Sequence, residues 1–444
     1  MDFCDTYSGF FKAARHNLSA KARCYLSGLL MKGERKNMER MEEYVQDYDY
    51  QSLQQFVSDS PWDHEALIER IGKDVDALLG GNDSMLLIDE SGFAKKGKKS
   101  VGVARQWNGR MGKVDNAQVG VFAALSDGRS SCSLVDTRLY LPEEWTEDAK
   151  RCDKAKIPED KREFKAKPQL AWEMIESAQS NCLRFSWVGL DGLYGNCPEL
   201  LRNIAEAGLL FTADVHCNQH IYSKDPVPYL PERNSKCGRP PSRLQGRSQN
   251  ERIDSFFNGA NAPEFKKVFV RQSTKGRIEV QASAERIWLW DGEEEARQWW
   301  AVCVIDSDTA ERKFFLSNAP ASASLSELVR KQACRYWIER TFQDAKTSVG
   351  MADYQARGWI AWHHHMSLVM LALLFLLKER RLHENTLELL SCQDVVGLLD
   401  VYLPRTDRTK QAVIDSMNKR HAKRRASIES AARRKATLSK SIQP

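Results

Sequence analysis

The first 80 residues carry apolar side chains at three- and four-residue intervals, the spacing that places them on one face of an α-helix. Four stretches show this pattern, at residues 24–30, 41–45, 53–57 and 66–71. The last is preceded by Ser60, Pro61 and Asp63, residue types that commonly begin a helix. The pattern therefore predicts a small helical domain over residues 1–80.

After residue 80 the chain changes to short runs rich in β-branched and aromatic residues, bounded by Gly, Asn and Asp. Strands are predicted at residues 85–89, 100–107, 117–125 and 131–140, the first three forming a meander. Helices predicted at residues 169–179 and 198–207 then alternate with apolar runs at 184–191 and 209–214. This alternation predicts an α/β layer over residues 81–214.

Residues 215–318 show a different pattern, in which a Pro- and Arg-rich stretch precedes several segments of alternating apolar and polar residues. Those segments lie at residues 267–270, 277–282, 286–290 and 299–305. Because such alternation suits antiparallel strands, we expect a β-rich insertion and not a continuation of the α/β layer. Helical patterns resume over residues 319–380, which should complete the α/β domain, and residues 381–444 should form a helical, basic C-terminal region.

Length and composition fit a globular protein of two or three domains, since 42% of the 444 residues are apolar and 28% are charged. The net charge of +6 is too small to identify a nucleic-acid-binding protein by itself. Eleven cysteines without a C-x-x-C pair favour a reducing compartment over a disulfide framework or a zinc ribbon. The longest apolar run, residues 366–377, is shorter than the ~20 residues of a membrane span, so we expect a cytoplasmic protein without membrane contact.

Candidate chemistry centres on three carboxylates. Asp89 and Asp191 each end a predicted strand, where a turn or cap role is the simpler interpretation of a single aspartate. Arg335, Glu339 and Lys346 share one face of a predicted helix, and the simpler interpretation of that face is a salt-bridge stripe. The aromatic and apolar neighbours of Glu339 favour instead a position that is not fully solvated.

Two strand-end aspartates and a helical glutamate are hard oxygen ligands of the kind that hold two Mg²⁺ or Mn²⁺ ions ~3.5 to 4 Å apart. Such a pair catalyses in-line displacement at phosphorus, because one ion lowers the pKa of an attacking water or 3′-hydroxyl and the other stabilises the leaving oxygen. Arg335 and Lys346 would then hold neighbouring phosphates, the arginine by bidentate contact and the lysine as a point charge.

These residues lie in segments that resemble the DDE-class transposases of bacterial insertion sequences. The similar segments are residues 87–97, 100–107, 112–122, 190–195 and 335–346, within a resemblance that extends over residues 25–376. The last segment resembles the Y-(2)-R-(3)-E-(6)-K signature of the subgroup with a β-rich insertion between the second aspartate and the glutamate. Gln332 stands at the tyrosine position of that signature, and Tyr336 could serve in its place.

The resemblance implies a ribonuclease-H-like α/β catalytic domain with an inserted antiparallel β domain, a helical N-terminal domain that binds DNA, and a basic helical C-terminal region. It implies that Asp89, Asp191 and Glu339 are the catalytic metal ligands, with two Mg²⁺ or Mn²⁺ ions as cofactors. The activity would be cut-and-paste transposition, in which phosphodiester cleavage at the element ends precedes strand transfer. The partners would be double-stranded DNA, as terminal inverted repeats and as target, and a second copy of the chain in a homodimer on DNA.

Seven residues are predicted to contact DNA: Arg335, Lys346, Tyr336, Lys95, Lys96, Arg105 and Arg239. The lysines that follow the first aspartate equally suit a solvated turn. The Gly-Arg-Pro at residues 238–240 is similar to a minor-groove hook, but it equally suits a flexible linker. The basic tail after Pro404 suits either end binding or a disordered solubilising segment. The three consecutive histidines at residues 363–365 are expected on a helix surface and not at a metal.

Two other functions compete with transposition. A transposase-derived DNA-binding protein without catalysis would normally have lost a carboxylate, whereas all three are present. An aspartyl phosphohydrolase with Asp89 as its nucleophile would need a second aspartate two residues later, where Ser91 stands.

Overall fold

The computed structural model describes residues 2–13, 16–109, 112–232, 241–260, 262–273, 276–292, 295–307, 309–387, 389–406 and 409–440. Its N-terminal part is helical and comprises α1 (Asp2–Thr6), a 3₁₀ turn (Ser8–Phe11), the short paired strands β1 (Lys12–Ala13) and β2 (His16–Asn17), α2 (Ser19–Leu30), α3 (Met38–Met41), α4 (Tyr50–Ser58) and α5 (His64–Leu79). Asp49 and Asp63 begin α4 and α5, because their carboxylates accept hydrogen bonds from backbone N–H groups of the first turn.

A ten-stranded mixed sheet confirms the predicted α/β class. Its order is β11-β12-β13-β14-β8-β7-β3-β5-β4, and β6 also pairs with β5. The strands are β3 (Met85–Ala94), β4 (Ala104–Asn108), β5 (Lys113–Ser126), β6 (Cys132–Leu139), β7 (Trp187–Leu190), β8 (Leu210–Val215), β11 (Lys266–Ser273), β12 (Gly276–Leu289), β13 (Arg297–Asp306) and β14 (Arg312–Ser317). Among these described strands, the pairs β3–β7 and β7–β8 are parallel and the others are antiparallel, so the parallel part lies in the middle of the sheet.

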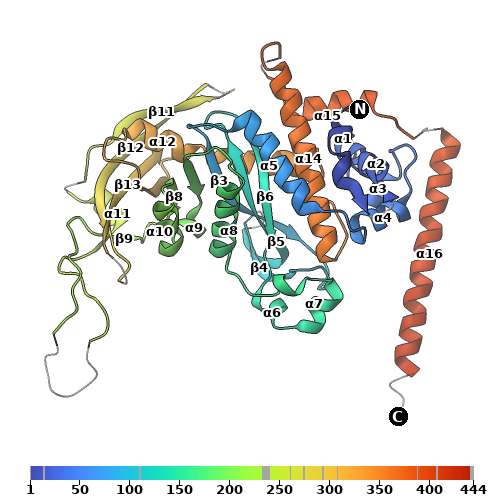
Figure 1. The fold of residues 1–444 in the computed structure, drawn as a ribbon, viewed down its shortest axis with the longest axis horizontal. Coiled ribbons are helices and arrows are strands. Elements are labelled where there is room, and N and C mark those ends of the chain that lie inside the picture. Colours follow the sequence, from blue (N-terminus) through green and yellow to red (C-terminus); the bar gives the residue numbers. More distant parts are fainter. Residues whose placement is uncertain are drawn as a thin grey trace.

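The insertion formed by β11 to β14 is antiparallel, as its alternating sequence predicts. The expectation that it stands apart from the α/β layer is wrong, because residues 314–316 of β14 pair with residues 213–215 of β8. This pairing gives the outer edge of β8 the hydrogen-bond partners that an edge strand lacks. Figure 1 shows the insertion at one end of the sheet and the N-terminal helices at the other. The small strands β9 (His220–Ile221) and β10 (Glu251–Arg252) and helix α11 (Ile253–Asn258) accompany the insertion.

The remaining helices are α6 (Glu143–Thr146), α7 (Ala149–Ala155), a 3₁₀ turn (Glu159–Lys161), α8 (Lys167–Ser180), α9 (Gly192–Gly195), α10 (Pro198–Glu206), α12 (Leu325–Ala333), α13 (Tyr336–Ser348), α14 (Trp359–His383), α15 (Cys392–Tyr402) and α16 (Lys410–Lys440). Within the region of helical patterns predicted over residues 319–380, the chain forms two successive helices, α12 and α13, before α14. At the junction the N–H of Arg335 donates to the carbonyl of Gln332 (3.1 Å) and the N–H of Ile338 donates to that of Arg335 (3.3 Å). These three-residue hydrogen bonds tighten the turn between the two helices.

Helix α14 is the core helix that joins the N-terminal helices to the sheet, since α2, α4, α5 and β6 all contact it. At 25 residues it is longer than its apolar run suggests, and by length and composition alone it could cross a membrane. However, 89% of its most apolar 18-residue window is buried inside the protein. The three histidines at residues 363–365 are therefore buried and not on a helix surface as expected.

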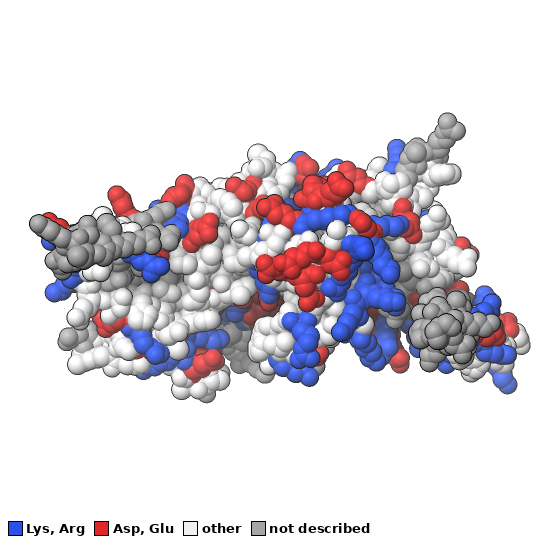
Figure 2. Space-filling view, turned by 90° about the horizontal axis from the view of Figure 1, so that it is seen from below, with Lys and Arg blue, Asp and Glu red and all other residues white. Residues whose placement is uncertain are grey.

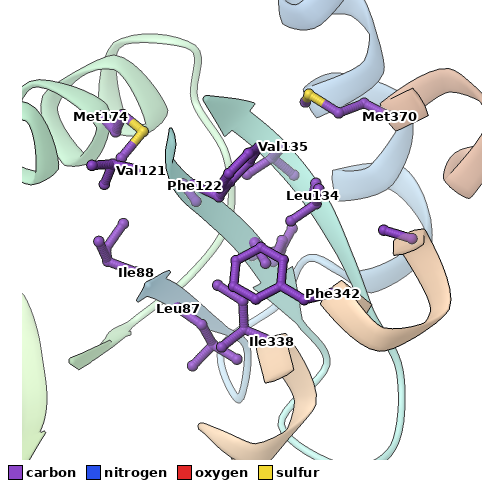
Figure 3. Close-up of a cluster of buried hydrophobic side chains, with 14 of the residues drawn as sticks. Leu87, Ile88, Val121, Phe122, Leu134, Val135, Met174, Ile338, Phe342 and Met370 are labelled. Atoms are coloured by element: carbon purple, nitrogen blue, oxygen red, sulfur yellow. The ribbon is translucent and has the colours of Figure 1, made fainter. Parts of the chain in front are cut away.

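Helix α13 is fixed against the sheet by its apolar side chains. Figure 3 shows Ile338 and Phe342 directed into a cluster with Leu87, Phe122 and Leu134. Phe342 meets the ring of Phe122 edge-on, with 5.4 Å between the ring centroids. Because Ile338 is fully buried and Phe342 nearly so, the rotation of α13 about its axis is set by packing, and with it the direction of the helix's charged residues.

Candidate active site

Asp89 and Asp191 lie side by side at the ends of a parallel pairing. The register of β3 and β7 pairs Ile88 with Leu190, and each aspartate is the next residue along its strand. Asp191 directly follows the last residue of β7, as predicted. The prediction that Asp89 ends its strand is wrong, because residues 89–94 remain paired with residues 117–122 of β5 and β3 continues to Ala94. The parallel part of the sheet therefore brings the two predicted carboxylates together.

Asp191 also has the cap role that was its simpler interpretation. Its Oδ1 accepts hydrogen bonds from the backbone N–H groups of Leu193 (2.9 Å) and Tyr194 (3.3 Å) at the start of α9. These bonds hold one carboxylate oxygen in place. Cap and active-site roles are compatible here, because Oδ2 takes no part in these two bonds.

Arg335 connects the third predicted carboxylate to the first. Its Nη2 lies 2.8 Å from Oε1 of Glu339, and its Nη1 lies 3.7 Å from Oδ2 of Asp89. The salt bridge between residues four apart on α13 is thus present, as the simpler interpretation predicts. Glu339 is half-exposed, with 51% of its side chain accessible, whereas Asp89 has only 13% exposed.

Burial and like charge set the electrostatics of the site. Desolvation raises the pKa of Asp89, the charge of Asp191 raises it further, and Arg335 partly offsets both. Desolvation also raises the pKa of Asp191, against the two backbone hydrogen bonds that lower it. Burial alone would lower the pKa of Arg335, but the four surrounding carboxylates, first among them Asp214, raise it. The site therefore contains more negative than positive charge, and Arg335 neutralises only part of it.

The donor set fits divalent metal ions. Carboxylate oxygens are the ligands that Mg²⁺ and Mn²⁺ prefer. Tyr194 lies close enough for the charges of Asp89 and Asp191 to raise its pKa, after the larger effect of burial, and its hydroxyl is buried without a hydrogen-bond partner among the described residues. An orphaned buried donor beside buried carboxylates is typical of a site that takes up water or an ion.

Sequence reasoning missed Asp214, Glu90 and Lys167, and it identified Gln332 only as the residue at the tyrosine position of the related signature. Like Asp89 and Asp191, Asp214 directly follows an apolar run, and this shared pattern could have identified it. Lys167, at the start of α8, lies 2.6 Å from the Glu90 carboxylate, and its charge also lowers the pKa of Asp191. No signal in the sequence connects these two residues, because they are far apart along the chain.

The predicted DNA contacts occupy different environments. Lys346 is half-buried, with its Nζ 5.8 Å from the ring centre of Phe342, and Tyr336 is 41% exposed. Lys95 is turned inward: its Nζ lies 3.9 Å from the ring centre of Tyr354, and burial lowers its pKa to about 8. Two predicted contacts, Lys96 and Arg105, are exposed. The seventh predicted contact, Arg239, lies outside the described residues.

Basic side chains also gather on the molecular surface. Figure 2 shows, on the lower face of the molecule, Lys and Arg forming a continuous area beside a cluster of Asp and Glu. Near α7 two basic segments meet, because Arg151 donates to the carbonyl of Lys98 (3.2 Å) in the lysine-rich turn after β3. Lys98 and its neighbour Lys99 are exposed, as are Lys150 and Lys154 of the α7 segment. Exposed cations on adjacent segments are suited to a nucleic-acid backbone.

Comparison with known proteins agrees with this geometry. The sequence profile of a family described as DDE superfamily endonuclease matches residues 7–277, which include Asp89 and Asp191 and end before Glu339. A curated protein of Microchaete diplosiphon, "Probable transposase for insertion sequence element IS701", is 28% identical over 222 residues. The match covers 50% of this chain and 54% of the relative, so the chain spans about half the length of the curated relative that it matches.

Proposed function

The chain belongs to the DDE superfamily of endonucleases, and we propose that it is an insertion-sequence transposase that cuts DNA at the ends of its element and joins those ends to target DNA. One observation carries the proposal: Asp89 and Asp191 adjoin on paired parallel strands, and Glu339 is linked to Asp89 through Arg335. The reaction would be cut-and-paste transposition on a catalytic domain of the ribonuclease-H-like type.

Endonucleases of this superfamily generally use divalent metal ions. In our proposal Asp89, Asp191 and Glu339 hold two Mg²⁺ or Mn²⁺ ions, for which carboxylate oxygens are suitable ligands. When bound, such ions activate an attacking water or 3′-hydroxyl and offset negative charge on the phosphate oxygens. Glu339 is more exposed than Asp89, so the approach of DNA is expected from the side of Glu339.

The chain's own cations would position the DNA. Arg335 lies one turn before Glu339 on α13 and Lys346 two turns after it, so both suit phosphates on either side of the scissile bond. Tyr336 is available for the contact that a tyrosine makes in the related signature, since Gln332 has replaced that tyrosine. The exposed Lys96 and Arg105 would contact the backbone farther from the cleavage point.

We also propose that the active form is a homodimer on double-stranded DNA and that it works in the cytoplasm. Helix α16 is 31 residues long and basic, and it extends away from the body of the protein (Figure 1). Arg420 of α16 lies 3.0 Å from Glu43 of the N-terminal part. In the dimer, α16 of one chain would contact the DNA end that the other chain cleaves.

Light scattering with and without end DNA tests the dimer. Full-length protein should pair two ends, whereas a form truncated at Pro404 should not, because it lacks α16. A truncated protein that pairs and cuts two ends normally would show that α16 is not part of the bridge.

A second candidate function is DNA binding without cleavage. It is favoured by one observation: within the described part of the chain, no three acidic, histidine or cysteine side chains converge on one metal position. An aspartyl phosphohydrolase is not supported, because Ser91 stands where its second aspartate would be needed.

Cleavage of a plasmid that carries the element ends, in Mg²⁺, separates these functions. The wild-type protein should cut the ends, and Asp89→Ala, Asp191→Ala and Glu339→Ala should each abolish cutting while end binding is largely retained. Glu327→Ala, on the neighbouring helix α12, is a matched control that should cut normally. End binding without cutting by the wild-type protein would favour the second function, and normal cutting by any of the three variants would refute the assignment of that residue.

A further inference from the structure

Asp214 is a fourth carboxylate of the site, and both of its oxygens have partners on the helix pair that carries Glu339. Its Oδ2 lies 3.0 Å from Nε of Arg335, and its Oδ1 accepts a hydrogen bond from Nε2 of Gln332 (2.8 Å). The side chain is mostly buried, with 20% exposed. Its backbone is also fixed, since β8 pairs with β14 and Gly195 of α9 approaches the Asp214 carbonyl so closely that an added Cβ would lie 2.0 Å from it.

Arg335 uses its two edges differently. The Nε edge faces Asp214, whereas Nη2 and Nη1 face Glu339 (2.8 Å) and Asp89 (3.7 Å). Two of the proposed metal ligands are therefore in contact with one guanidinium. A planar guanidinium can keep one edge bound while the other changes partner, because its five donors point in fixed and separate directions.

The charge of the site favours such a change. When all four carboxylates around Arg335 are ionised, they and the guanidinium carry a net charge of −3, and two divalent ions would change this to +1. At −3 the site repels a DNA phosphate, and at +1 it attracts one. The carboxylate that remains paired with Arg335 must then be one that does not bind a metal ion. Asp214 meets this condition, because its two oxygens are bound to Arg335 and Gln332.

We propose that Asp214 and Gln332 form a tether that keeps Arg335 in place by its Nε edge, so that the Nη edge moves from Asp89 and Glu339 to a DNA phosphate when divalent ions take up those two carboxylates. This inference rests on the proposed function. It assigns Asp214 and Gln332 as positioning residues, and it explains why glutamine can stand where the related signature has tyrosine.

Mn²⁺ binding measured by calorimetry, without DNA, tests the tether. In Asp214→Asn, Arg335 loses its permanent partner and pairs more strongly with the proposed ligands, so Mn²⁺ affinity should fall about 3- to 10-fold, since tenfold corresponds to 1.4 kcal/mol. Asp214→Asn also removes a nearby negative charge, and this direct effect persists when Arg335 is absent. We therefore compare the loss of Mn²⁺ affinity caused by Asp214→Asn in the wild-type protein with the loss that it causes in Arg335→Ala protein. The difference between these two losses measures the tether.

DNA-end binding supplies the second measurement. With Mn²⁺ present, the salt dependence of binding should be about one unit of slope lower in Asp214→Asn than in the wild type, because one phosphate contact is lost. Gln332→Ala removes only one hydrogen bond, so it should shift both the Mn²⁺ affinity and the salt slope in the same direction as Asp214→Asn but by a smaller amount. If Asp214→Asn does not fold, Gln332→Ala serves as the test variant. Asp136→Asn is the matched control, since Asp136 is a buried aspartate paired with Arg138 (2.5 Å), and it should change neither.

The outcomes separate the tether from the proposed function. Equal losses of Mn²⁺ affinity in the presence and absence of Arg335, or an unchanged salt slope, would overturn the tether even if the wild-type protein binds Mn²⁺ and cuts DNA. Wild-type protein that binds no Mn²⁺ would instead refute the proposed function, and the tether with it. A smaller loss in the Arg335→Ala background together with the lower slope would support both.

Discussion

Acid should destabilise this protein through His365, which lies fully buried on α14. The hydroxyl of Tyr25 donates to its Nδ1 (2.9 Å), its Nε2 donates to the carbonyl of Met351 (3.3 Å), and the ring of Tyr354 stacks on it at 4.8 Å. These contacts satisfy the neutral ring. Desolvation lowers the pKa of His365 to about 3, from an ordinary value of 6.5.

The sign follows from proton uptake. Between pH 6.5 and 3 the unfolded chain carries one more proton at this histidine than the folded chain, so the free energy of unfolding decreases as pH falls, by about 1.4 kcal/mol per pH unit. At pH 5, which is 1.5 units below the ordinary value, the loss is about 2 kcal/mol. His365→Gln should be less stable than the wild type at pH 8, because it loses the ring packing, but it does not take up this proton.

Urea unfolding at pH 8, 7, 6 and 5 measures the effect. The stability difference between wild type and His365→Gln should be constant above pH 7 and should shrink by about 2 kcal/mol by pH 5. His421→Gln is the control, because His421 is exposed on α16 and its replacement removes a histidine without disturbing the buried contacts of α14. A difference for His365→Gln that stays constant down to pH 5 would refute the reasoning, since it would mean that the buried ring accepts a proton as easily as a solvated one.

Three further predictions concern the site and its support. Gly195→Ala should abolish DNA cleavage in the plasmid assay and lower the melting temperature, because the new Cβ would meet the Asp214 carbonyl; wild-type cleavage would show that α9 can move without cost. Phe342→Ala should lower the free energy of urea unfolding by about 3 to 5 kcal/mol, since it removes a nearly buried ring from the cluster under α13, and a loss below 1 kcal/mol would contradict that packing role. Lys346→Ala should reduce the salt slope of DNA-end binding by about one unit, whereas an unchanged slope with unchanged cleavage would return Lys346 to a structural role.

Local patterns along the chain predicted most of the elements that carry the site. The apolar runs before Asp89 and Asp191 correctly indicated strands, because a buried strand must be apolar whatever it pairs with. The spacing of Arg335 and Glu339 correctly indicated one helix face, since residues four apart on a helix are neighbours by geometry. The resemblance drawn from the same residues is confirmed by the family match.

Predictions that depended on the surroundings of an element were less successful. The histidines of α14 look like surface residues in the sequence, but helices from the N-terminal part cover them. The inserted strands look separate, but β14 completes the edge of β8. In both cases the deciding partner is more than 90 residues away along the chain, and a local pattern contains no information about it.

By itself the sequence determined the class of the fold, the two aspartates that follow apolar strand segments and the charged face of α13, because each depends on side chains within a few residues of one another. Only the tertiary structure decided what those charges do. Packing of Ile338 and Phe342 turns α13 toward the strand ends, and pairing of β8 with β7 places Asp214 within 3.0 Å of Arg335. Arg335 is consequently shared among carboxylates from three separate elements, since charge pairing in a buried site depends on distance through space and not on position along the chain.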